Sequence, residues 1–429
     1  MFCIKVLNMY NLKKIAKNFL EDSMKKHIIL TLILITLIFP LFIFTGCSSG
    51  QAGLFITKLP NKIVYLLNEE FNYNGLKVEA LNTDGTTTLQ KIEKKDVSSV
   101  DTSTFGEKVV TVTKSNHSTA FNIYVANVVI TPEDNVREKL ENCNDGDVVY
   151  FKQGEYKSNN NELTDLIINK KISIVGDGDK NTIINGNFVV GAEKEGLNFK
   201  ALDNFENVKI IRLGFNLNYK VNNSVIKFDN NMLNVTNGAI SGYNTKNLYV
   251  ESCSFKGFAN GITMNNADGL SVVRCKFDDL LLNGIEIKED CKNTTIYKNV
   301  FTDIAKNVVY AIDDKQQDLA MISLGFNQKG NKGVLIAKNT FTRMAQKIGK
   351  LNYFDDNSLL IKDKKDLTKL SYINNSSIIL LYSNSQNNLQ STGVILSANN
   401  YGEALQNIKI GKDKNTQINQ SGIIINEDF

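Results

Sequence analysis

The sequence of 429 residues contains no tryptophan, only two histidines and only four arginines. One histidine, His27, lies beside an N-terminal hydrophobic run, and the other, His117, lies in a polar loop sequence. Two such isolated histidines exclude a histidine-rich zinc site and a histidine-dependent catalytic triad. So few arginines argue against an arginine-clustered nucleic-acid surface, and we expect no nucleic-acid partner.

The chain also lacks a global charge of one sign. Its formal net charge is +4, with 49 basic and 45 acidic residues. Residues 1–47 hold six lysines and two acidic residues, which leaves 43 basic and 43 acidic residues in the remainder. Since the remainder is formally neutral, no overall field attracts polyanions, and any affinity for an acidic polymer has to come from local groups.

One long apolar run is present, at Ile28–Phe44, after Met24 and two lysines and before Thr45-Gly46-Cys47. A charged start, an apolar core and small residues before a cleavage point are typical of a secretory signal. The segment resembles bacterial lipoprotein signals, which implies that residues 1–47 are a leader with its true start at Met24. Lipidation of Cys47 would then anchor the chain to the outer face of the bacterial cell membrane. The alternative is an uncleaved transmembrane anchor, which also leaves the bulk of the chain outside the cytoplasm.

Residues 51–130 contain short β-rich runs separated by turn residues, with apolar and polar residues alternating over Lys108–Thr113. This pattern predicts a small all-β sandwich. We expect strands that include Ile63–Leu67, Leu76–Leu81, Val97–Val100, Val109–Val112 and Phe121–Val125. The order of elements resembles bacterial group 3 immunoglobulin-like domains, carried by Pro60, Tyr65, Asn74-Gly75-Leu76, Asp84-Gly85-Thr86 and Gly106. The resemblance implies a spacer or a binding unit, and the scattered charges favour the spacer.

Residues 131–429 contain a repeat of about 23 residues. Asn-Gly pairs begin at positions 237, 260 and 283, and Asn307-Val308 follows in the same series. A second series, aliphatic-x-aliphatic-x-x-(Cys/Asn/Leu)-x-aromatic, ends at aromatic residues 215, 255, 277, 301, 341 and 401. Short β-branched strands at this period cannot bury a face alone, so the pattern predicts a right-handed parallel β-helix, each coil rising about 4.8 Å.

This fold stacks equivalent positions of successive coils. We expect an aromatic stack that includes Phe277 and Phe301, and a hydrogen-bonded column of Asn299, Asn339 and Asn399. Cys253 and Cys275 take the same position in adjacent coils, either as a disulfide or, as we favour, as buried free thiols. Thr131-Pro132-Glu133-Asp134 reads as a helix start, which predicts an N-terminal cap helix over residues 132–142.

The first coils resemble the pectin-lyase-like superfamily at residues 145–156, 171–178 and 182–186. That resemblance implies a fold but not a reaction. The Trp-Ile-Asp-His stretch of pectate lyases is absent, and the polygalacturonase elements are absent apart from Asp-Asp pairs at 278–279 and 313–314. Residues 253–258 resemble a stretch of pectinesterases. Pectinesterases have Gln-Asp-Thr directly after this stretch, whereas this sequence has Ala259-Asn260-Gly261.

A cluster of side chains remains as a candidate site. Glu286 and Lys288 alternate along one strand, and Asp279 and Asp303 each lie two residues after the repeated aromatic residue. As a lyase site, the two aspartates would hold Ca²⁺ and a neighbouring basic residue would act as the base. Candidate substrate-binding residues are Arg274 and Lys298, which share a basic column with Arg212 and Lys338, and Tyr310, expected with Thr263 at the stacked position of Glu286. The alternative is that these are ordinary solvated charges on the outside of the solenoid.

Three functions are compatible with the sequence. The leading hypothesis is a lipid-anchored cell-surface protein whose immunoglobulin-like spacer presents a β-helix that binds a polysaccharide or another surface polymer without cleaving it and without a cofactor. The second is a divergent polysaccharide lyase or hydrolase, which would use Ca²⁺ if it is a lyase. The third is a structural envelope component. Residues 315–333 and 343–393 break the repeat, and such excursions often carry a binding surface.

Overall fold

The computed structural model describes the chain from Gln51 onward, with gaps. The described residues are 51–157, 163–196, 198–217, 219–222, 225–228, 238–280, 282–304, 310–311, 320–324, 331–342, 353–354, 360–361, 377–381, 392–400, 408–410 and 423–426. The predicted leader, with Cys47, lies outside them. None of the helices within these ranges is long and apolar enough to cross a membrane. The chain divides into two compact units, of which the second includes Tyr124–Phe429.

The first unit contains two three-stranded sheets. One has the order β1 (Gln51–Lys58), β3 (Lys77–Asn82), β4 (Thr87–Gln90), and the other β2 (Val64–Tyr65), β6 (His117–Val125), β5 (Gly106–Lys114). The predicted strand at Val97–Val100 is wrong, since η1 (Lys94–Asp96) precedes it and Val97 makes only an isolated bridge to Val112. Strand β4 was missed because its residues are almost all exposed and carry no alternation of apolar and polar side chains.

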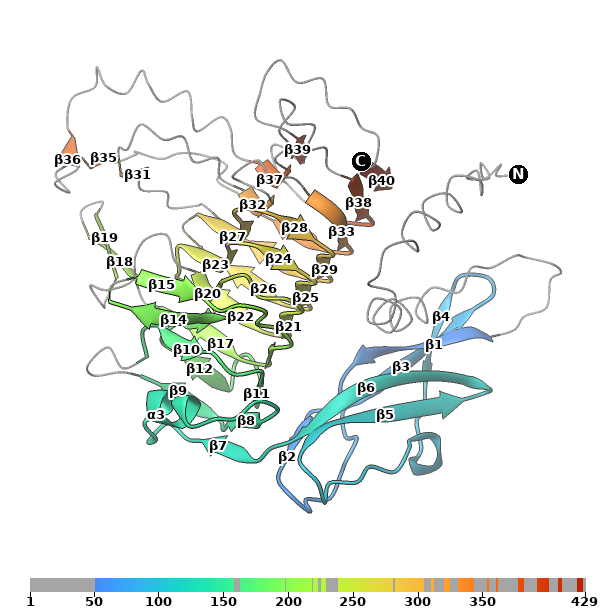
Figure 1. Ribbon diagram of the computed structural model, residues 1–429. Helices are drawn as coiled ribbons and strands as arrows, with labels where there is room; N and C mark the ends of the chain where they lie inside the picture. Colours follow the sequence, from blue (N-terminus) through green and yellow to red (C-terminus); the bar gives the residue numbers. More distant parts are fainter. Residues whose placement is uncertain are drawn as a thin grey trace, which may run out of the picture. The chain divides into compact units, whose positions relative to one another are not determined.

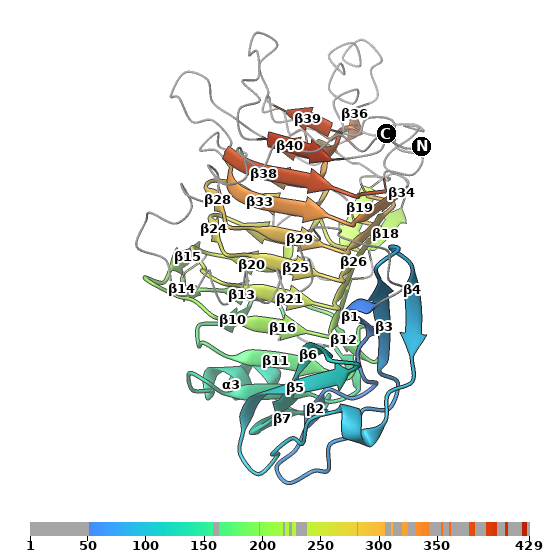
Figure 2. The ribbon, with the colours of Figure 1, turned by 90° about the vertical axis from the view of Figure 1, so that its right-hand side faces the viewer.

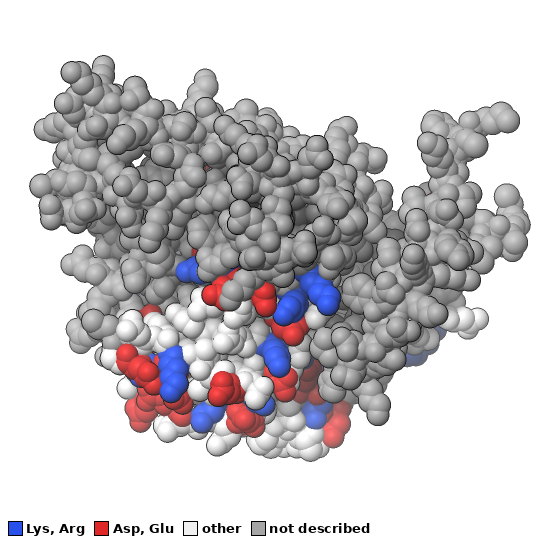
Figure 3. Space-filling view, turned by 45° about the horizontal axis from the view of Figure 1, so that its top comes forward, with Lys and Arg blue, Asp and Glu red and all other residues white. Residues whose placement is uncertain are grey.

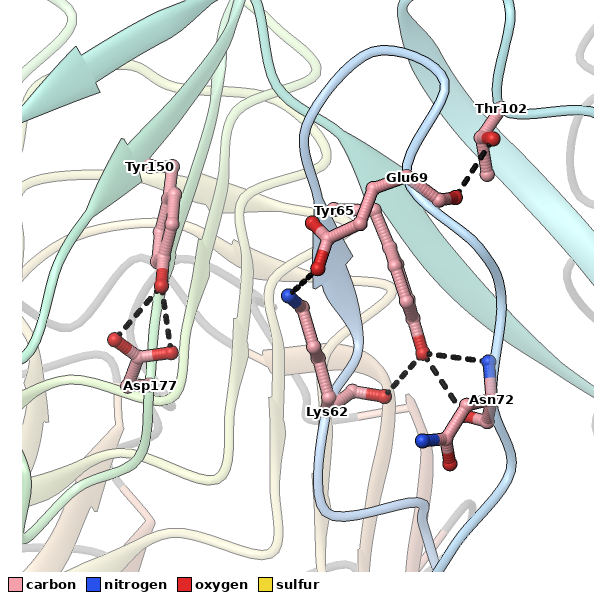
Figure 4. Close-up of polar contacts among 7 residues, drawn as sticks. All are labelled: Lys62, Tyr65, Glu69, Asn72, Thr102, Tyr150 and Asp177. Atoms are coloured by element: carbon pink, nitrogen blue, oxygen red, sulfur yellow. Dashed lines mark hydrogen bonds and ion pairs between the residues drawn. The ribbon is translucent and has the colours of Figure 1, made fainter.

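A buried tyrosine secures one loop of this unit. The hydroxyl of Tyr65 donates a hydrogen bond to the carbonyl oxygen of Asn72 at 2.8 Å and accepts one from the Asn72 N–H at 3.3 Å (Figure 4). Lys62 forms an ion pair with Glu69, and Thr102 donates to the Glu69 carbonyl at 2.8 Å. The ring of Tyr65 is buried, so its body packs in the core while its hydroxyl satisfies loop backbone groups that would otherwise lack partners.

The second unit is a parallel β-helix built from three long sheets, as the repeat predicted (Figures 1 and 2). The eight-stranded sheet contains β10 (Leu166–Ile168), β13 (Phe188–Val190), β20 (Gly238–Gly242), β23 (Asn260–Met264), β27 (Asn283–Ile287), β32 (Ala320–Leu324), β37 (Ser377–Leu381) and β39 (Ile408–Ile410), in that order. Its strands pair in parallel from coil to coil, so equivalent residues of successive coils lie side by side.

The twelve-stranded sheet contains β7 (Val128–Ile130), β8 (Val148–Phe151), β11 (Ser173–Gly176), β16 (Lys209–Ile211), β21 (Tyr249–Glu251), β24 (Ala267–Asp268), β25 (Ser271–Val273), β28 (Cys291–Lys292), β29 (Thr295–Tyr297), β33 (Asn331–Ala337), β38 (Thr392–Ser397) and β40 (Ile423–Asn426). The seven-stranded sheet contains β9 (Gly154–Tyr156), β12 (Thr182–Ile184), β17 (Gly214–Asn216), β22 (Ser254–Lys256), β26 (Lys276–Asp278), β30 (Val300–Thr302) and β34 (Thr340–Thr342). Strand β7 falls within the range predicted for the sandwich but pairs with β8 of the β-helix.

Short strand pairs project from the coils. They are β14 (Ala192–Glu195) with β15 (Asn198–Ala201), β18 (Tyr219–Asn222) with β19 (Val225–Phe228), and β31 (Tyr310–Ala311) with β35 (Tyr353–Phe354) and β36 (Leu360–Ile361). The chain therefore leaves the solenoid and returns to it without breaking the three long sheets.

The predicted aromatic stack is confirmed in the core. Rings of Phe215, Phe255, Phe277, Phe301 and Phe341 lie with neighbouring centroids 5.4, 4.8, 4.6 and 5.1 Å apart and their planes within 21° of parallel. These separations are close to the spacing of hydrogen-bonded strands, because each coil contributes one ring to the column. The stack begins with Phe215, whose other neighbour, Phe188, meets it edge-on.

The glycines of the Asn-Gly pairs make room for this stack. A Cβ atom on Gly261 would lie 2.5 Å from a ring carbon of Phe277, and one on Gly284 would lie 2.7 Å from the ring of Phe301. The Asn-Gly pairs therefore begin strands β23 and β27 instead of forming turns, because only glycine lets the strand approach the ring so closely.

Two columns of buried asparagines connect the coils. In the predicted column, the Asn399 side-chain oxygen accepts from the Asn339 backbone N–H at 2.9 Å, and the Asn339 oxygen accepts from the Asn299 N–H at 2.9 Å. Sequence reasoning missed the second column, in which Asn260 accepts from the Asn283 N–H at 3.0 Å. The side-chain oxygens of these asparagines accept hydrogen bonds from buried backbone N–H groups. Such groups need a partner when they are shielded from water.

Cys253 and Cys275 are buried free thiols, as expected from their place in adjacent coils. Burial is the main cause that raises the pKa of the Cys253 thiol far above its ordinary value. Both thiols are buried in the core, where they pack as small apolar side chains.

The cap helix is shorter than predicted. It is α3 (Val136–Glu141), with Asn135 as the N-cap residue, whose side chain accepts from the Glu138 N–H at 3.2 Å. Residues 131–134, which were expected to start the helix, form a turn in which the Asp134 carboxylate accepts from the Thr131 N–H at 2.7 Å. Residues 131–134 thus form a turn of their own, and Asn135 is the residue that caps the start of the helix.

Candidate functional site

A polar column runs along the outer side of the eight-stranded sheet. In β27, Ile285 and Ile287 belong to the core, so the strand alternation points Glu286 away from it. The strand register places Thr263 of β23 on one side of Glu286 and Ser323 of β32 on the other. Ser241 of β20 precedes Thr263 in the same column. We call Ser241, Thr263, Glu286 and Ser323 the polar column.

The side chains of the polar column are almost completely shielded from solvent. The exposed fraction is 4% for Thr263, 8% for Glu286 and 1% for Ser323. Outward positions on a solenoid strand are normally solvated, so this burial is unusual for the outer side of a strand. Glu286 is therefore not an ordinary solvated charge on the outside of the solenoid, as the alternative interpretation had it.

Three members of the column also lack hydrogen-bond partners among the residues that the structure describes. The hydroxyl oxygens of Thr263 and Ser323 are buried without a partner. No hydrogen bond contributes to the charge state of the Glu286 carboxyl either. Ser241 is different, because its hydroxyl accepts from the Gly238 N–H at 3.2 Å.

Burial raises the pKa of the Glu286 carboxyl above its ordinary value of 4.5, and the positive charge of Lys288 opposes this with a smaller effect. Lys288 follows directly after β27 and is partly exposed. Lys288 therefore lies close enough to Glu286 for its charge to lower the pKa of the carboxyl, although burial has the larger effect on that pKa. The neutral form of the carboxyl is favoured compared with a carboxyl in water.

Tyr310 does not stack on Glu286, and the series that placed it there is wrong. The strand that follows β27 in the sheet is β32, so Ser323 occupies the expected position of Tyr310. Tyr310 instead starts β31, which pairs with β35 outside the long sheets, and Asn307-Val308 lies outside the described residues. A recurring isoleucine followed by a polar residue would have found Ser323, at 240–241, 262–263, 285–286 and 322–323.

Asp279 and Asp303 lie in successive turns, as predicted. Both follow strands of the seven-stranded sheet and have left-handed backbone conformations, with φ of 51° and 55°. The turns are joined by hydrogen bonds such as that from the Asp279 N–H to the Thr302 carbonyl at 3.2 Å. The two aspartates thus belong to turns that follow the seven-stranded sheet, whereas Glu286 lies in a strand of the eight-stranded sheet.

Calcium is poorly matched by the two aspartates. Ca²⁺ takes six to eight oxygen ligands, often from several carboxylates. Within the described ranges, no group of three or more His, Cys, Asp or Glu side chains lies close enough together to hold a metal ion. The Ca²⁺ ion expected at these aspartates stays a prediction from the sequence.

The basic column of Arg212, Arg274, Lys298 and Lys338 is a column of turns. All four residues have left-handed backbones, with φ between 55° and 59°, in the two-residue turns that lead into the seven-stranded sheet. Arg274 forms an ion pair with the buried Glu251, and the Lys298 ammonium lies 5.3 Å from the centroid of the Tyr297 ring. The Arg274 side chain is thus paired within the protein, in a turn between the twelve-stranded and the seven-stranded sheets. Its role in substrate binding remains a prediction.

Charges of both signs are interspersed on the visible described surface (Figure 3). Lys276 pairs with Asp179 at 2.7 Å and Lys256 with Asp278 at 3.4 Å. This mixture agrees with the balanced composition after residue 47, and the visible described surface presents no field of one sign to a polyanion.

Comparisons with known proteins bear on the two units separately. A search of curated proteins finds no match to the chain. Among solved structures, a Yersinia enterocolitica family 28 exopolygalacturonase matches with 9% sequence identity and a TM-score of 0.25, over 78% of this chain and 73% of that one. Residues 59–125 match the family described as bacterial Ig-like domain (group 3). The first unit therefore carries a bacterial Ig-like domain of group 3, as its residues predicted, and the second is a parallel β-helix.

Proposed function

We propose that this protein is a lipid-anchored cell-surface protein in which the Ig-like domain presents the β-helix, and that the β-helix binds a polysaccharide without cleaving it. The polar column is the binding site. The observation that carries this proposal is the set of three adjacent buried polar side chains, Thr263, Glu286 and Ser323, without partners among the described residues. A hydroxyl-rich polymer would supply the partners that these side chains need.

A second candidate function is glycoside cleavage, which one observation favours. The pKa of Glu286 is raised by burial, as is common for a general acid. Hydrolysis of a glycoside normally uses two carboxyl groups on either side of the bond. The other members of the polar column are hydroxyl-bearing residues, so the column holds no second carboxyl group and the binding function is better supported.

The test combines binding with product analysis. The purified protein is incubated with pectate, alginate, neutral plant polysaccharides and glycosaminoglycans, and the bound fraction is measured by co-sedimentation with the insoluble polymer or by affinity electrophoresis. We expect retention by at least one polymer, no unsaturated product and no new reducing ends. Turnover that disappears in Glu286→Gln would replace the binding function by the enzymatic one. No retention by any polymer would leave the structural envelope role.

The anchor is tested separately. In cells, Cys47→Ala is expected to move the protein from the membrane fraction to the medium or to leave an unprocessed precursor, because Cys47 would carry the lipid. A Ser49→Ala variant, two residues further along the chain, is the matched control and should leave the distribution unchanged. Equal membrane retention of Cys47→Ala and the wild type, with the same processed mass, would contradict lipid anchoring at this residue.

A further inference from the structure

Three buried polar side chains in a row on adjacent strands, with no partners among the described residues, are rare in proteins. About nine-tenths of buried polar groups have a hydrogen-bond partner, and each one left without a partner costs about 1–3 kcal/mol. Thr263, Glu286 and Ser323 belong to strands β23, β27 and β32, which are consecutive in the sheet. Ser241, in the same column, is satisfied by its own strand. The lack of partners is therefore confined to one stretch of the column.

We infer that Thr263, Glu286 and Ser323 form a subsite for an uncharged sugar, which they bind through its hydroxyl groups. The inference rests on the proposed function and narrows its ligand to neutral polysaccharides. The register sets the geometry, since the three residues occupy neighbouring strands about 4.8 Å apart and thus span about 10 Å along the solenoid. A chain of linked sugars can lie along a column of this length.

The chemistry of the three side chains favours hydroxyl partners. A serine or threonine hydroxyl and a protonated carboxyl each offer one donor and accept at least one hydrogen bond. A sugar hydroxyl has the same mixed character, so each contact can form in either direction. Burial favours the neutral form of Glu286 compared with a carboxyl in water, so an uncharged hydroxyl is a better partner here than an anion.

An anionic ligand fits this subsite poorly. A carboxylate, sulfate or phosphate needs several donors and a positive charge when it is buried. Of the described charged groups, only Lys288 influences Glu286, and its effect is smaller than that of burial. An ionised Glu286 would also repel such a ligand. The sugar hydroxyls would offer Thr263 and Ser323 the hydrogen bonds that no described group supplies.

The inference is tested by isothermal titration calorimetry on the mature protein. The neutral probes are cellohexaose, xylohexaose and mannohexaose, and the charged probe is hexagalacturonate. Thr263→Val and Ser323→Ala each remove one hydroxyl with little change of shape. Glu286→Gln keeps a neutral group that donates and accepts, and Glu286→Leu removes both functions. Thr302→Val, an outward threonine of the seven-stranded sheet, is the matched control.

We expect a neutral hexasaccharide to bind, and Thr263→Val and Ser323→Ala each to raise its Kd about tenfold, the loss of one well-formed hydrogen bond. Glu286→Gln should stay within about threefold of the wild type, Glu286→Leu should weaken binding at least as much as Thr263→Val, and Thr302→Val should change nothing.

Other outcomes separate the inference from the proposed function. Binding of hexagalacturonate alone would overturn the neutral subsite while the protein remains a polysaccharide binder. So would neutral binding that is indifferent to Thr263→Val and Ser323→Ala, because the sugar would then bind elsewhere. Loss of neutral binding in Glu286→Gln would show that the carboxylate acts in its charged form and would also overturn it. Failure of every polysaccharide and oligosaccharide to bind would remove the proposed function as well.

Discussion

Replacing Thr263 by valine is expected to make the protein more stable than the wild type, which is unusual for a change at a buried polar residue. The substitution exchanges the γ-hydroxyl for a methyl group of nearly the same size. Because the hydroxyl has no partner among the described residues, its removal breaks no hydrogen bond there and ends the desolvation of a polar group.

The magnitude follows from the environment of the hydroxyl. A buried polar group without a partner costs about 1–3 kcal/mol, so Thr263→Val should increase the free energy of unfolding by about 1 kcal/mol once imperfect packing of the methyl group is allowed for.

Thr182→Val is the opposite case at a residue that is equally buried. The Thr182 hydroxyl accepts from the Asp177 N–H at 3.0 Å and donates to the Phe151 carbonyl at 3.4 Å. Its loss leaves both backbone groups without this partner and should lower the free energy of unfolding by about 2 kcal/mol.

The assay is urea unfolding at equilibrium, followed by far-ultraviolet circular dichroism, for the wild type and the two variants. The two valine variants should move the midpoint in opposite directions with an unchanged slope, which shows that the same structure unfolds in each. If Thr263→Val destabilises the protein as much as Thr182→Val does, the Thr263 hydroxyl has a partner in solution. The argument for a ligand at the polar column would then lose its premise.

Three further changes test other parts of the argument. Glu286→Gln should be more stable than the wild type at neutral pH but equal to it below about pH 4.5. The Glu286 carboxyl holds its proton more tightly in the folded state than in the unfolded state, so the free energy of unfolding of the wild type falls as pH rises from 4.5 through the raised pKa. If the free energy of unfolding depends on pH in the same way in both proteins, this reasoning is wrong. Asn339→Ala should cost about 3 kcal/mol because the Asn299 N–H and the Ile296 carbonyl both lose their partner, whereas the half-exposed Asn185→Ala should cost less than about 1 kcal/mol; equal midpoints in urea would refute the role of the column. Gly261→Ala should lower the melting temperature strongly because its Cβ atom would meet the Phe277 ring, and Gly53→Ala, with nothing within 4 Å, is the control that should not.

The parts of the fold that depend on repetition were predictable from the sequence. The phenylalanine column and the asparagines at 299, 339 and 399 recur at fixed positions relative to each other, so stacking them required only the period. The cap helix illustrates the limit, because two capping sequences, at Thr131 and Asn135, compete within five residues. In the structure the Asp134 carboxylate accepts from the Thr131 N–H, so Thr131 begins a turn and the helix begins after Asn135.

The candidate site was predictable at its centre and not at its edges. Glu286 stood out because an acid in an otherwise apolar strand is conspicuous. Its neighbour Ser323 was hidden by the excursion that separates β27 from β32, since a fixed period placed Tyr310 there instead. The lack of hydrogen-bond partners is not visible in a sequence at all, because it depends on which groups the fold brings near each hydroxyl.

The two-residue turns into the seven-stranded sheet have a consequence for how such a chain can change its length. Five strands of the twelve-stranded sheet, β16, β21, β25, β29 and β33, are each followed after two residues by a strand of the seven-stranded sheet, at 211–214, 251–254, 273–276, 297–300 and 337–340. Among the described residues, the strand pairs that project from the coils enter at the other two corners. The corner with the left-handed turns thus works as a fixed splice point, and whole coils could be added, removed or exchanged between such proteins as cassettes while the rest of the column keeps its alignment.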